Sequence, residues 1–267
     1  MFSSYQYRFM STQTDRLRLF DTMVQAICIV MHMLMPWPYW SLVKINFRKE
    51  ISFVYDCYNR SINYLRVSIT DRCNLLCTYC MPEEGIKLLP RKQILSFDEI
   101  VDTVKYGVEH GINKVRITGG EPLVRKDAVK LVEMIARING ITDLAMTTNG
   151  TLLPQFAQAL ADAGLMRVNI SLDSLNEANF RKITRIGELK QVLQGIEAAQ
   201  KAGLKPIKLN CVIQKSVDEP DARQVAAYAN SLGIEVRFIR QMNLKTGEFY
   251  PVHGGTGGDC VICNRLR

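Results

Sequence analysis

Short β-branched runs alternate with longer segments of helical periodicity from Leu65 to the end of the chain's central part. The runs expected to be strands are 65–70, 114–118, 144–148, 167–171, 207–213 and 235–239. The segments expected to be helices are 97–109, 128–138, 155–163, 189–202 and 222–232. Strands separated by helices pair in parallel, so we expect an α/β fold, either an open doubly wound sheet or a curved partial barrel.

Local signals support these helices. Ser96 is followed three residues later by Glu99, which is the pattern of a capping box at a helix start. A glycine follows four of the predicted helices and precedes the next strand, as expected for helix ends. These glycines are Gly111, Gly164, Gly203 and Gly233.

The first 55 residues do not fit this alternation. Residues 23–40 are strongly apolar, but the segment contains His32 and two prolines and is short for a membrane span. We therefore expect an N-terminal extension (1–55) of unassigned role, and no membrane span. Only a targeting role for this extension would favour a mitochondrial location.

Charge and cysteine content limit the partners and the compartment. Lys and Arg outnumber Asp and Glu by 34 to 26, which suits an anionic small ligand, nucleic acid or an acidic partner. No Lys/Arg-rich run of the kind that binds nucleic acid is present, so we expect no nucleic-acid partner. Eight cysteines in 267 residues do not resemble a disulfide framework, and they favour a reducing, cytoplasmic location.

Three cysteines follow the first predicted strand in a C-x3-C-x2-C pattern: Cys73, Cys77 and Cys80. Three thiolates are one ligand short of a closed zinc site or a fully ligated four-iron cluster. A cluster held by three cysteines keeps one iron open for a substrate or for a cofactor such as S-adenosylmethionine (SAM). Zinc with a distant fourth ligand and a redox pair at Cys77 and Cys80 remain as alternatives.

Polar motifs follow the other predicted strands, and the carboxyl ends of parallel strands meet at one edge, where barrels of this kind place their active sites. Gly119 and Gly120 would let the backbone approach a ligand closely, and Glu121 would accept a hydrogen bond from an ammonium group. An ordinary strand-to-helix turn is the alternative. Further along, Thr147, Asn149 and Ser171 would bind a ribose or base edge, or cap the following helices.

Three basic residues lie within otherwise apolar strands: Arg66, Arg116 and Lys208. A buried cation is costly unless it reaches a cavity or a partner, and a polyphosphate is one such partner. Structural ion pairs are the alternative. At the end of the chain, Cys260 and Cys263 form half a metal site with Arg265 and Arg267 beside it, although a redox pair or half a zinc knuckle would look the same.

Several of these motifs together resemble one family. They are the segments 63–82, 115–125, 146–150, 168–173 and 263–267. In this order they resemble the MoaA-like GTP 3′,8-cyclases, which are radical SAM enzymes of molybdenum-cofactor biosynthesis. The resemblance implies a partial (β/α)6 TIM-like barrel over residues 56–242 and a partial auxiliary-cluster segment over residues 243–267.

The resemblance also implies a role for each motif residue. The first [4Fe–4S] cluster would be held by Cys73, Cys77 and Cys80. SAM would be bound by Tyr79, Gly119, Gly120, Glu121, Ser171 and Met242. GTP would be bound by Arg66, Arg116, Thr147, Lys208, Arg265 and Arg267. Cys260 and Cys263 would hold a second [4Fe–4S] cluster. The family's third ligand to that cluster is not in this sequence, so we expect a C-terminally incomplete second site.

In this family an adenosyl radical takes hydrogen from C3′ of GTP, and the C3′ carbon then bonds to C8 of guanine; Arg265 and Arg267 would assist the catalytic step. The implied partners are a reductant protein such as a flavodoxin or ferredoxin, and a cyclic pyranopterin synthase downstream; a homodimer is compatible with the sequence. The alternatives are a radical SAM enzyme with another substrate, such as a peptide, and a non-catalytic iron–sulfur or zinc protein.

Overall fold

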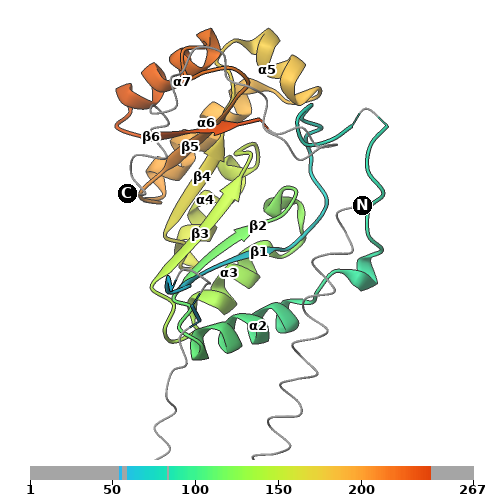
Figure 1. Ribbon diagram of the computed structural model, residues 1–267, viewed down its shortest axis with the longest axis vertical. Coiled ribbons are helices and arrows are strands. Elements are labelled where there is room, and N and C mark those ends of the chain that lie inside the picture. Colours follow the sequence, from blue (N-terminus) through green and yellow to red (C-terminus); the bar gives the residue numbers. More distant parts are fainter. Residues whose placement is uncertain (1–53, 56–58, 83, 242–267) are drawn as a thin grey trace, which may run out of the picture. The chain divides into compact units, whose positions relative to one another are not determined.

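The computed structural model describes residues 54–241 except 56–58 and 83, and its centre is one six-stranded parallel sheet (Figure 1). Neighbouring strands pair in chain order, from β1 to β6. Their bounds are β1 Tyr64–Ser68, β2 Lys114–Thr118, β3 Asp143–Thr148, β4 Arg167–Ser171, β5 Lys208–Ile213 and β6 Glu235–Arg240. All six predicted strands are confirmed to within two residues at each end.

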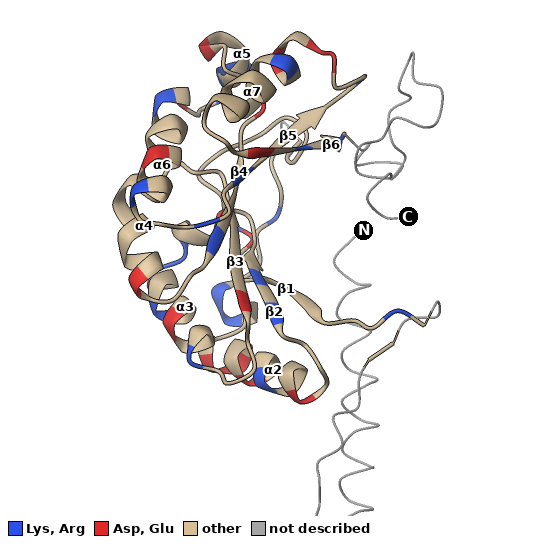
Figure 2. Ribbon diagram, turned by 90° about the vertical axis from the view of Figure 1, so that its left-hand side faces the viewer, with Lys and Arg blue, Asp and Glu red and all other residues tan. Residues whose placement is uncertain are grey.

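Six α-helices join these strands. They are α2 Phe97–Glu109, α3 Ala128–Ala136, α4 Leu153–Asp162, α5 Glu177–Thr184, α6 Leu189–Lys201 and α7 Pro220–Ser231, with short 3₁₀ turns η2 Arg91–Gln93 and η3 Pro122–Val124. The sheet is curved, and α2, α3, α4 and α6 line its outer side (Figure 2). A parallel sheet that curves with helices outside is the partial (β/α)6 barrel expected from the sequence. Helix α5 was not predicted.

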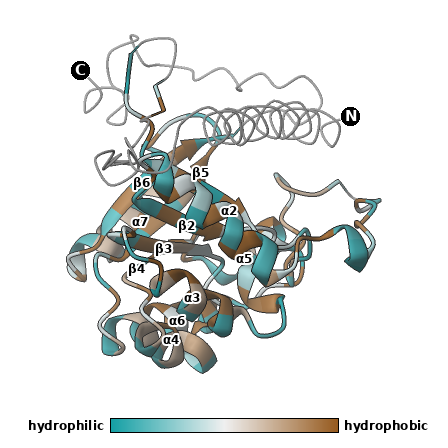
Figure 3. Ribbon diagram, turned by 90° about the horizontal axis from the view of Figure 1, so that it is seen from below, coloured by the Kyte–Doolittle hydropathy of each residue, from teal (hydrophilic) through white to brown (hydrophobic). Residues whose placement is uncertain are grey.

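The two faces of the sheet differ sharply in chemistry, and the strands are banded in hydropathy as a result (Figure 3). In β2, Val115 and Ile117 are fully buried toward the helices, whereas Lys114, Arg116 and Thr118 alternate with them on the inner face. The same alternation in the other strands builds one hydrophobic core between sheet and helices. The inner, concave face is left polar.

Helix boundaries form as the sequence predicts. The Ser96 hydroxyl accepts from the Glu99 amide, and the Glu99 carboxylate accepts from the Ser96 amide, so the predicted capping box is confirmed. The four predicted helix-end glycines all have positive φ, between 65° and 96°.

Parts of the predicted site lie outside the described residues. These are Met242, Cys260, Cys263, Arg265 and Arg267, together with nearly all of the N-terminal extension. Within the described ranges, no helix is long and apolar enough to cross a membrane.

Candidate active site

The cysteine loop, residues 69–81, leaves β1 and passes directly over the start of the turn that follows β2. The Gly120 amide donates to the Thr70 carbonyl at 2.7 Å, and the Glu121 amide donates to the Arg72 carbonyl at 2.8 Å. A Cβ atom at Gly120 would lie 2.3 Å from the Arg72 oxygen. Glycine is therefore required here because the cysteine loop lies against the backbone.

Glu121 differs from the sequence-based interpretation. Its side chain is 0% exposed, and it accepts hydrogen bonds from the Thr148 hydroxyl (2.8 Å), the Asn149 amide (2.6 Å) and the Leu123 amide (3.2 Å). A carboxylate with these partners joins the ends of β2 and β3. The Glu121 carboxylate is therefore occupied by contacts within the protein, and nothing in the structure supports the predicted hydrogen bond from a ligand ammonium group.

The first half of the cysteine loop is attached to the end of β3. The Asn149 side-chain amide donates to Asn74 Oδ1 at 2.8 Å and to Cys73 Sγ at 3.8 Å. Asn74 in turn donates to the Thr151 hydroxyl at 2.9 Å, and Thr151 donates to Asn149 Oδ1 at 2.7 Å. Asn149 thus both starts the turn before α4 and orients a cysteine.

The second half of the loop is attached to β4 and β5 through a buried carboxylate. Asp173 is 6% exposed and accepts from the Tyr79 hydroxyl at 2.7 Å and from the Val212 amide at 2.7 Å. Burial raises the pKa of Asp173, which the two hydrogen bonds partly oppose. Sequence reasoning assigned no role to Asp173, although it lies in a quoted motif after the fourth strand.

Arg185, just after α5, holds both ends of the Cys77–Cys80 segment. Its guanidinium donates to the carbonyls of Leu76 and Met81, each at 2.9 Å. Backbone bonds from Leu76 to Thr184 (3.2 Å) and from Thr78 to Ile183 (2.9 Å) complete the attachment. Arg185 was not predicted, because the helix before it was not predicted.

The three cysteine thiols favour their protonated state unless a cation binds to them. Burial raises the pKa of Cys77 to about 12 and that of Cys80 to about 11, with repulsion between neighbouring thiolates adding to both. Burial also raises the pKa of Cys73. Among the described residues, no three His, Cys, Asp or Glu side chains converge as a single metal ion requires. Three thiolates spread over a loop fit a larger, positively charged iron–sulfur core better than one zinc ion.

The concave face of the sheet is rich in cations. Its basic residues are Arg66, Lys114, Arg116, Arg167, Lys208 and Arg237. Arg167 forms a bidentate pair with Asp143, and Lys208 and Arg237 share Glu235. For Lys208 the structural ion pair is therefore present.

Arg66 and Arg116 have no carboxylate partner among the described residues, and they lie side by side in the β1–β2 register. Arg116 lies over the Tyr64 ring at 5.5 Å. Burial lowers the pKa of the Arg116 guanidinium, and nearby arginines lower it further. Arg116 is half-buried and Arg66 beside it is exposed, so the cost of an unpaired buried charge applies to Arg116, and both cations leave the face ready for an anion.

Next to these arginines, buried polar atoms lack hydrogen-bond partners within the described part of the chain. They are Arg116 Nε, Thr147 Oγ1 and both amide atoms of Asn169, whose side chain is 1% exposed. Asn169 pairs with Thr147 and Lys208 in the strand register, so these three residues form one row across the sheet, next to the row that contains Arg116. Unsatisfied buried groups in native proteins call for an explanation, and a polar ligand on this face supplies one.

The remaining predicted residues are placed as follows. Ser171 is the last residue of β4, on the concave face, and Gly119 follows β2 beside the loop. Cys211, in β5, is 1% exposed and packs as a small residue of the hydrophobic core. The strand ends therefore bring together the cysteine loop, the glycine turn, Thr147 and Ser171.

A curved parallel sheet with a three-cysteine loop after its first strand defines a class of iron–sulfur enzymes. Residues 67–229 match the model of the radical SAM superfamily, so the chain belongs to that superfamily. The superfamily uses a [4Fe–4S] cluster and SAM, and the three thiols on the loop fit such a cluster.

More specific similarities exist to curated relatives. A GTP 3′,8-cyclase of Thermodesulfovibrio yellowstonii is 53% identical over 198 residues, which cover 74% of this chain and 59% of the relative. A GTP 3′,8-cyclase of Alkaliphilus oremlandii is 52% identical over 187 residues, or 70% and 58% of the two chains. The chain thus spans about three fifths of the length of these relatives.

Solved structures share the fold at low identity. Streptococcus suis SuiB bound to S-adenosylmethionine matches with a TM-score of 0.58 and 16% identity, covering 72% of this chain and 44% of SuiB. Native anSMEcpe with bound AdoMet matches with a TM-score of 0.54 and 20% identity, covering 67% and 51%. These similarities confirm the TIM-like fold.

Proposed function

We propose that this chain carries the radical SAM part of a GTP 3′,8-cyclase. The observation that supports it best is the concave face, where Arg66 and Arg116 have no carboxylate partner and lie beside unpartnered buried groups, next to the cysteine loop. A triphosphate supplies acceptors for guanidinium groups, and a nucleoside supplies donors and acceptors for Thr147. The names of the similar relatives point to the same substrate.

Each motif residue has a proposed role. Cys73, Cys77 and Cys80 would hold the cluster, which with bound SAM supplies an adenosyl radical. Tyr79, Gly119, Gly120, Ser171 and Met242 would position SAM, and Glu121 would act by fixing the turn that carries the glycines. The protein's own contribution is to orient GTP and exclude water.

GTP would be bound by Arg66, Arg116, Thr147 and Lys208 on the sheet and by Arg265 and Arg267 near the chain end. Lys208 would exchange part of its contact with Glu235 for a phosphate oxygen. Cys260 and Cys263 would be two ligands of a second cluster, in a segment (243–267) separate from the core (56–242) and the extension (1–55). An electron donor protein and a cyclic pyranopterin synthase would act before and after this reaction.

The test is formation of 5′-deoxyadenosine by the anaerobically reconstituted chain with SAM and dithionite, with and without GTP. Stimulation by GTP together with a cyclised nucleotide supports the proposal. SAM cleavage at the same rate without GTP would reject GTP as the substrate of this chain while keeping the radical SAM assignment.

A variant separates this proposal from a non-catalytic zinc protein. Cys77→Ala should remove the four-iron absorbance of the first cluster, while Cys211→Ala, the change of a buried core thiol in β5 that is not one of the three loop cysteines, should retain it. A full four-iron signal in Cys77→Ala would exclude the assignment of the triplet.

A further inference from the structure

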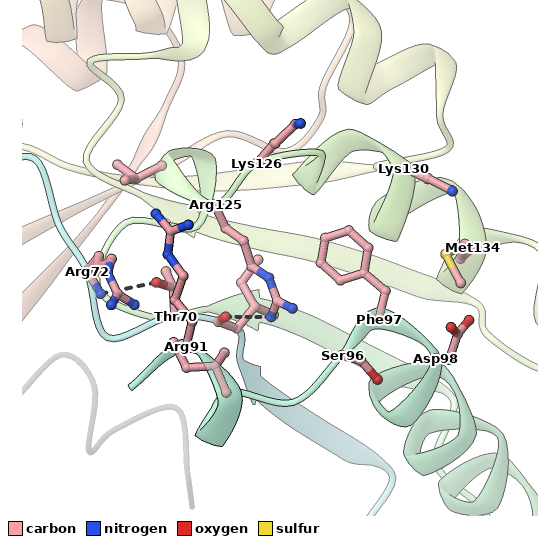
Figure 4. Close-up of a pocket in the computed structure, with 13 residues that line it drawn as sticks. Thr70, Arg72, Arg91, Ser96, Phe97, Asp98, Arg125, Lys126, Lys130 and Met134 are labelled. Carbon is pink, nitrogen blue, oxygen red and sulfur yellow. Dashed lines mark hydrogen bonds between the residues drawn. The ribbon is translucent and has the colours of Figure 1, made fainter. Parts of the chain in front are cut away.

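A cavity of about 620 Å³ opens at the rim of the fold between α2 and α3 (Figure 4). The side chains that line it come from the cysteine loop's first residues, η2, the start of α2, η3 and α3. None of them belongs to the concave face of the sheet. The cavity is therefore reached from the helix side, and a molecule bound there would not compete with one bound on the concave face.

The cavity is strongly basic. Its charged lining residues are Arg72, Arg91, Arg125, Lys126, Lys130 and a single acid, Asp98. Arg125 is fixed in place, because its guanidinium donates to the carbonyls of Ile69 and Leu95, each at 2.7 Å, and stacks 4.4 Å from the Phe97 ring.

The other cations are available to a partner. Arg91, Lys126 and Lys130 are exposed and have no carboxylate partner among the described residues. Figure 4 shows Lys126 and Lys130 on the α3 side of the cavity and Arg91 on the opposite side. Cations arranged around a hollow favour an acidic partner over a neutral one.

Exposed apolar side chains adjoin the same cavity. Val124, which lines it, is 38% exposed, and Leu95 and Leu88 nearby are 40% and 43% exposed. The segment that carries Leu88 is joined to the cysteine loop, because the Leu89 amide donates to Asp71 at 2.6 Å. Apolar contacts beside a charged rim are the usual composition of a protein–protein interface.

The cavity also adjoins the cysteines. Its wall includes Thr70 and Arg72, and Cys73 is the next residue in the chain. Arg72 is held there by Asp71 (3.2 Å) and by the Leu89 carbonyl (3.3 Å). A redox protein seated in this cavity would approach the cysteine loop from its outer side, away from the nucleotide face.

We propose that this basic cavity is the docking site for the acidic surface of a small electron-donor protein that carries a low-potential flavin or iron–sulfur group. One electron would leave the donor's reduced group, which is oxidised, and enter the cluster held by the three cysteines, which is reduced; no proton or other group is transferred. This inference rests on the proposed function for the presence of that cluster.

The test compares Lys126→Glu/Lys130→Glu with Lys190→Glu/Lys201→Glu, a control with the same change in net charge on exposed positions of α6. Lys130 lies in the first turn of α3, where a glutamate is favourable, so the first variant should fold. Two readouts are measured: the dissociation constant of oxidised flavodoxin by calorimetry, and the rate of cluster reduction by reduced flavodoxin in stopped flow.

We expect the cavity variant to lose about tenfold in affinity and in reduction rate, at the low end of electrostatic steering effects, and the control to change by less than twofold. The difference should shrink at high salt. Reduction by dithionite should be unchanged in both variants, and this reaction also reports separately on whether the cluster forms. Equal behaviour of the two variants with flavodoxin would overturn the docking site even if GTP turnover is confirmed.

Discussion

Removal of the Arg185 guanidinium should loosen the cysteine loop without unfolding the protein. Arg185→Ala deletes the two hydrogen bonds to the carbonyls of Leu76 and Met81. A hydrogen bond from a charged donor contributes about 1.5–3 kcal/mol, and solvent near the half-buried Arg185 reduces each of its two bonds to about 1 kcal/mol, or about 2 kcal/mol in total. Because 1.4 kcal/mol corresponds to a factor of about 10, we expect the reconstituted cluster to be lost about 30-fold faster.

The assay follows the visible absorbance of the cluster under anaerobic conditions with an excess of an iron chelator. Arg181→Ala is the matched control, since Arg181 is an exposed arginine of α5, four residues before Arg185. It should lose its cluster at the wild-type rate. A rate in Arg185→Ala within twofold of wild type, with an unchanged fold, would refute the proposed clamp.

Backbone conformation gives this prediction a second control. Arg185 has φ 64° and ψ −43°, a region that glycine enters more easily than other residues. Arg185→Gly should relieve about 1 kcal/mol of backbone strain relative to Arg185→Ala, so it should unfold at a higher denaturant concentration than the alanine variant. It should still lose the cluster as fast as the alanine variant, because the guanidinium is absent from both.

Three further predictions concern the rest of the site. Gly120→Ala places a methyl group 2.3 Å from a carbonyl oxygen of the cysteine loop and should cost about 3 kcal/mol by urea unfolding, whereas Gly107→Ala in α2 should cost less than about 1 kcal/mol. The Arg167 guanidinium lowers the pKa of Asp143, so this pair stabilises the fold above the unfolded pKa of about 3.9, and the stabilisation is lost as the pH falls through the folded pKa; Asp143→Asn should remove this part of the acid dependence in urea titrations. Arg116→Met should weaken GTP binding in calorimetry yet raise the unfolding free energy by about 1 kcal/mol, because it removes a half-buried cation that has no carboxylate partner among the described residues; a loss of stability would indicate a structural ion pair instead.

Much of the fold is predictable because hydrophobic burial is encoded locally. Val115 and Ile117 alternate with polar residues along β2, and that alternation fixes both the strand and the face that meets the helices. The Ser96–Glu99 capping box is likewise a contact between near neighbours in sequence. The cysteine spacing is also a local feature of the sequence, so the position of the cysteine loop directly after β1 was predicted correctly.

Helix α5 was missed because few of its residues are buried, so its sequence carries a weak apolar pattern. Only Phe180 and Thr184 are buried among its eight residues, so its apolar stripe is short and the segment is polar on average. Its start depends on the Asn176 side chain, which accepts from the Asn179 amide at 3.0 Å. Without the helix, the long-range contacts of Arg185 and of Asp173 with the cysteine loop could not be inferred, since they join residues about 100 positions apart.

The two halves of the candidate site differ in how their polar groups are satisfied. The cysteine loop is hydrogen-bonded to Asn149 after β3, to Asp173 after β4 and to Arg185 after α5, so the protein's own contacts set its conformation. On the concave face, Asn169 and Arg116 instead keep buried polar atoms without partners within the described residues. Because such atoms cost stability, a face that retains them gains most when a polar anion binds. The protein therefore holds the cysteine loop by its own hydrogen bonds and leaves unsatisfied polar groups on the sheet for the anion that we propose binds there.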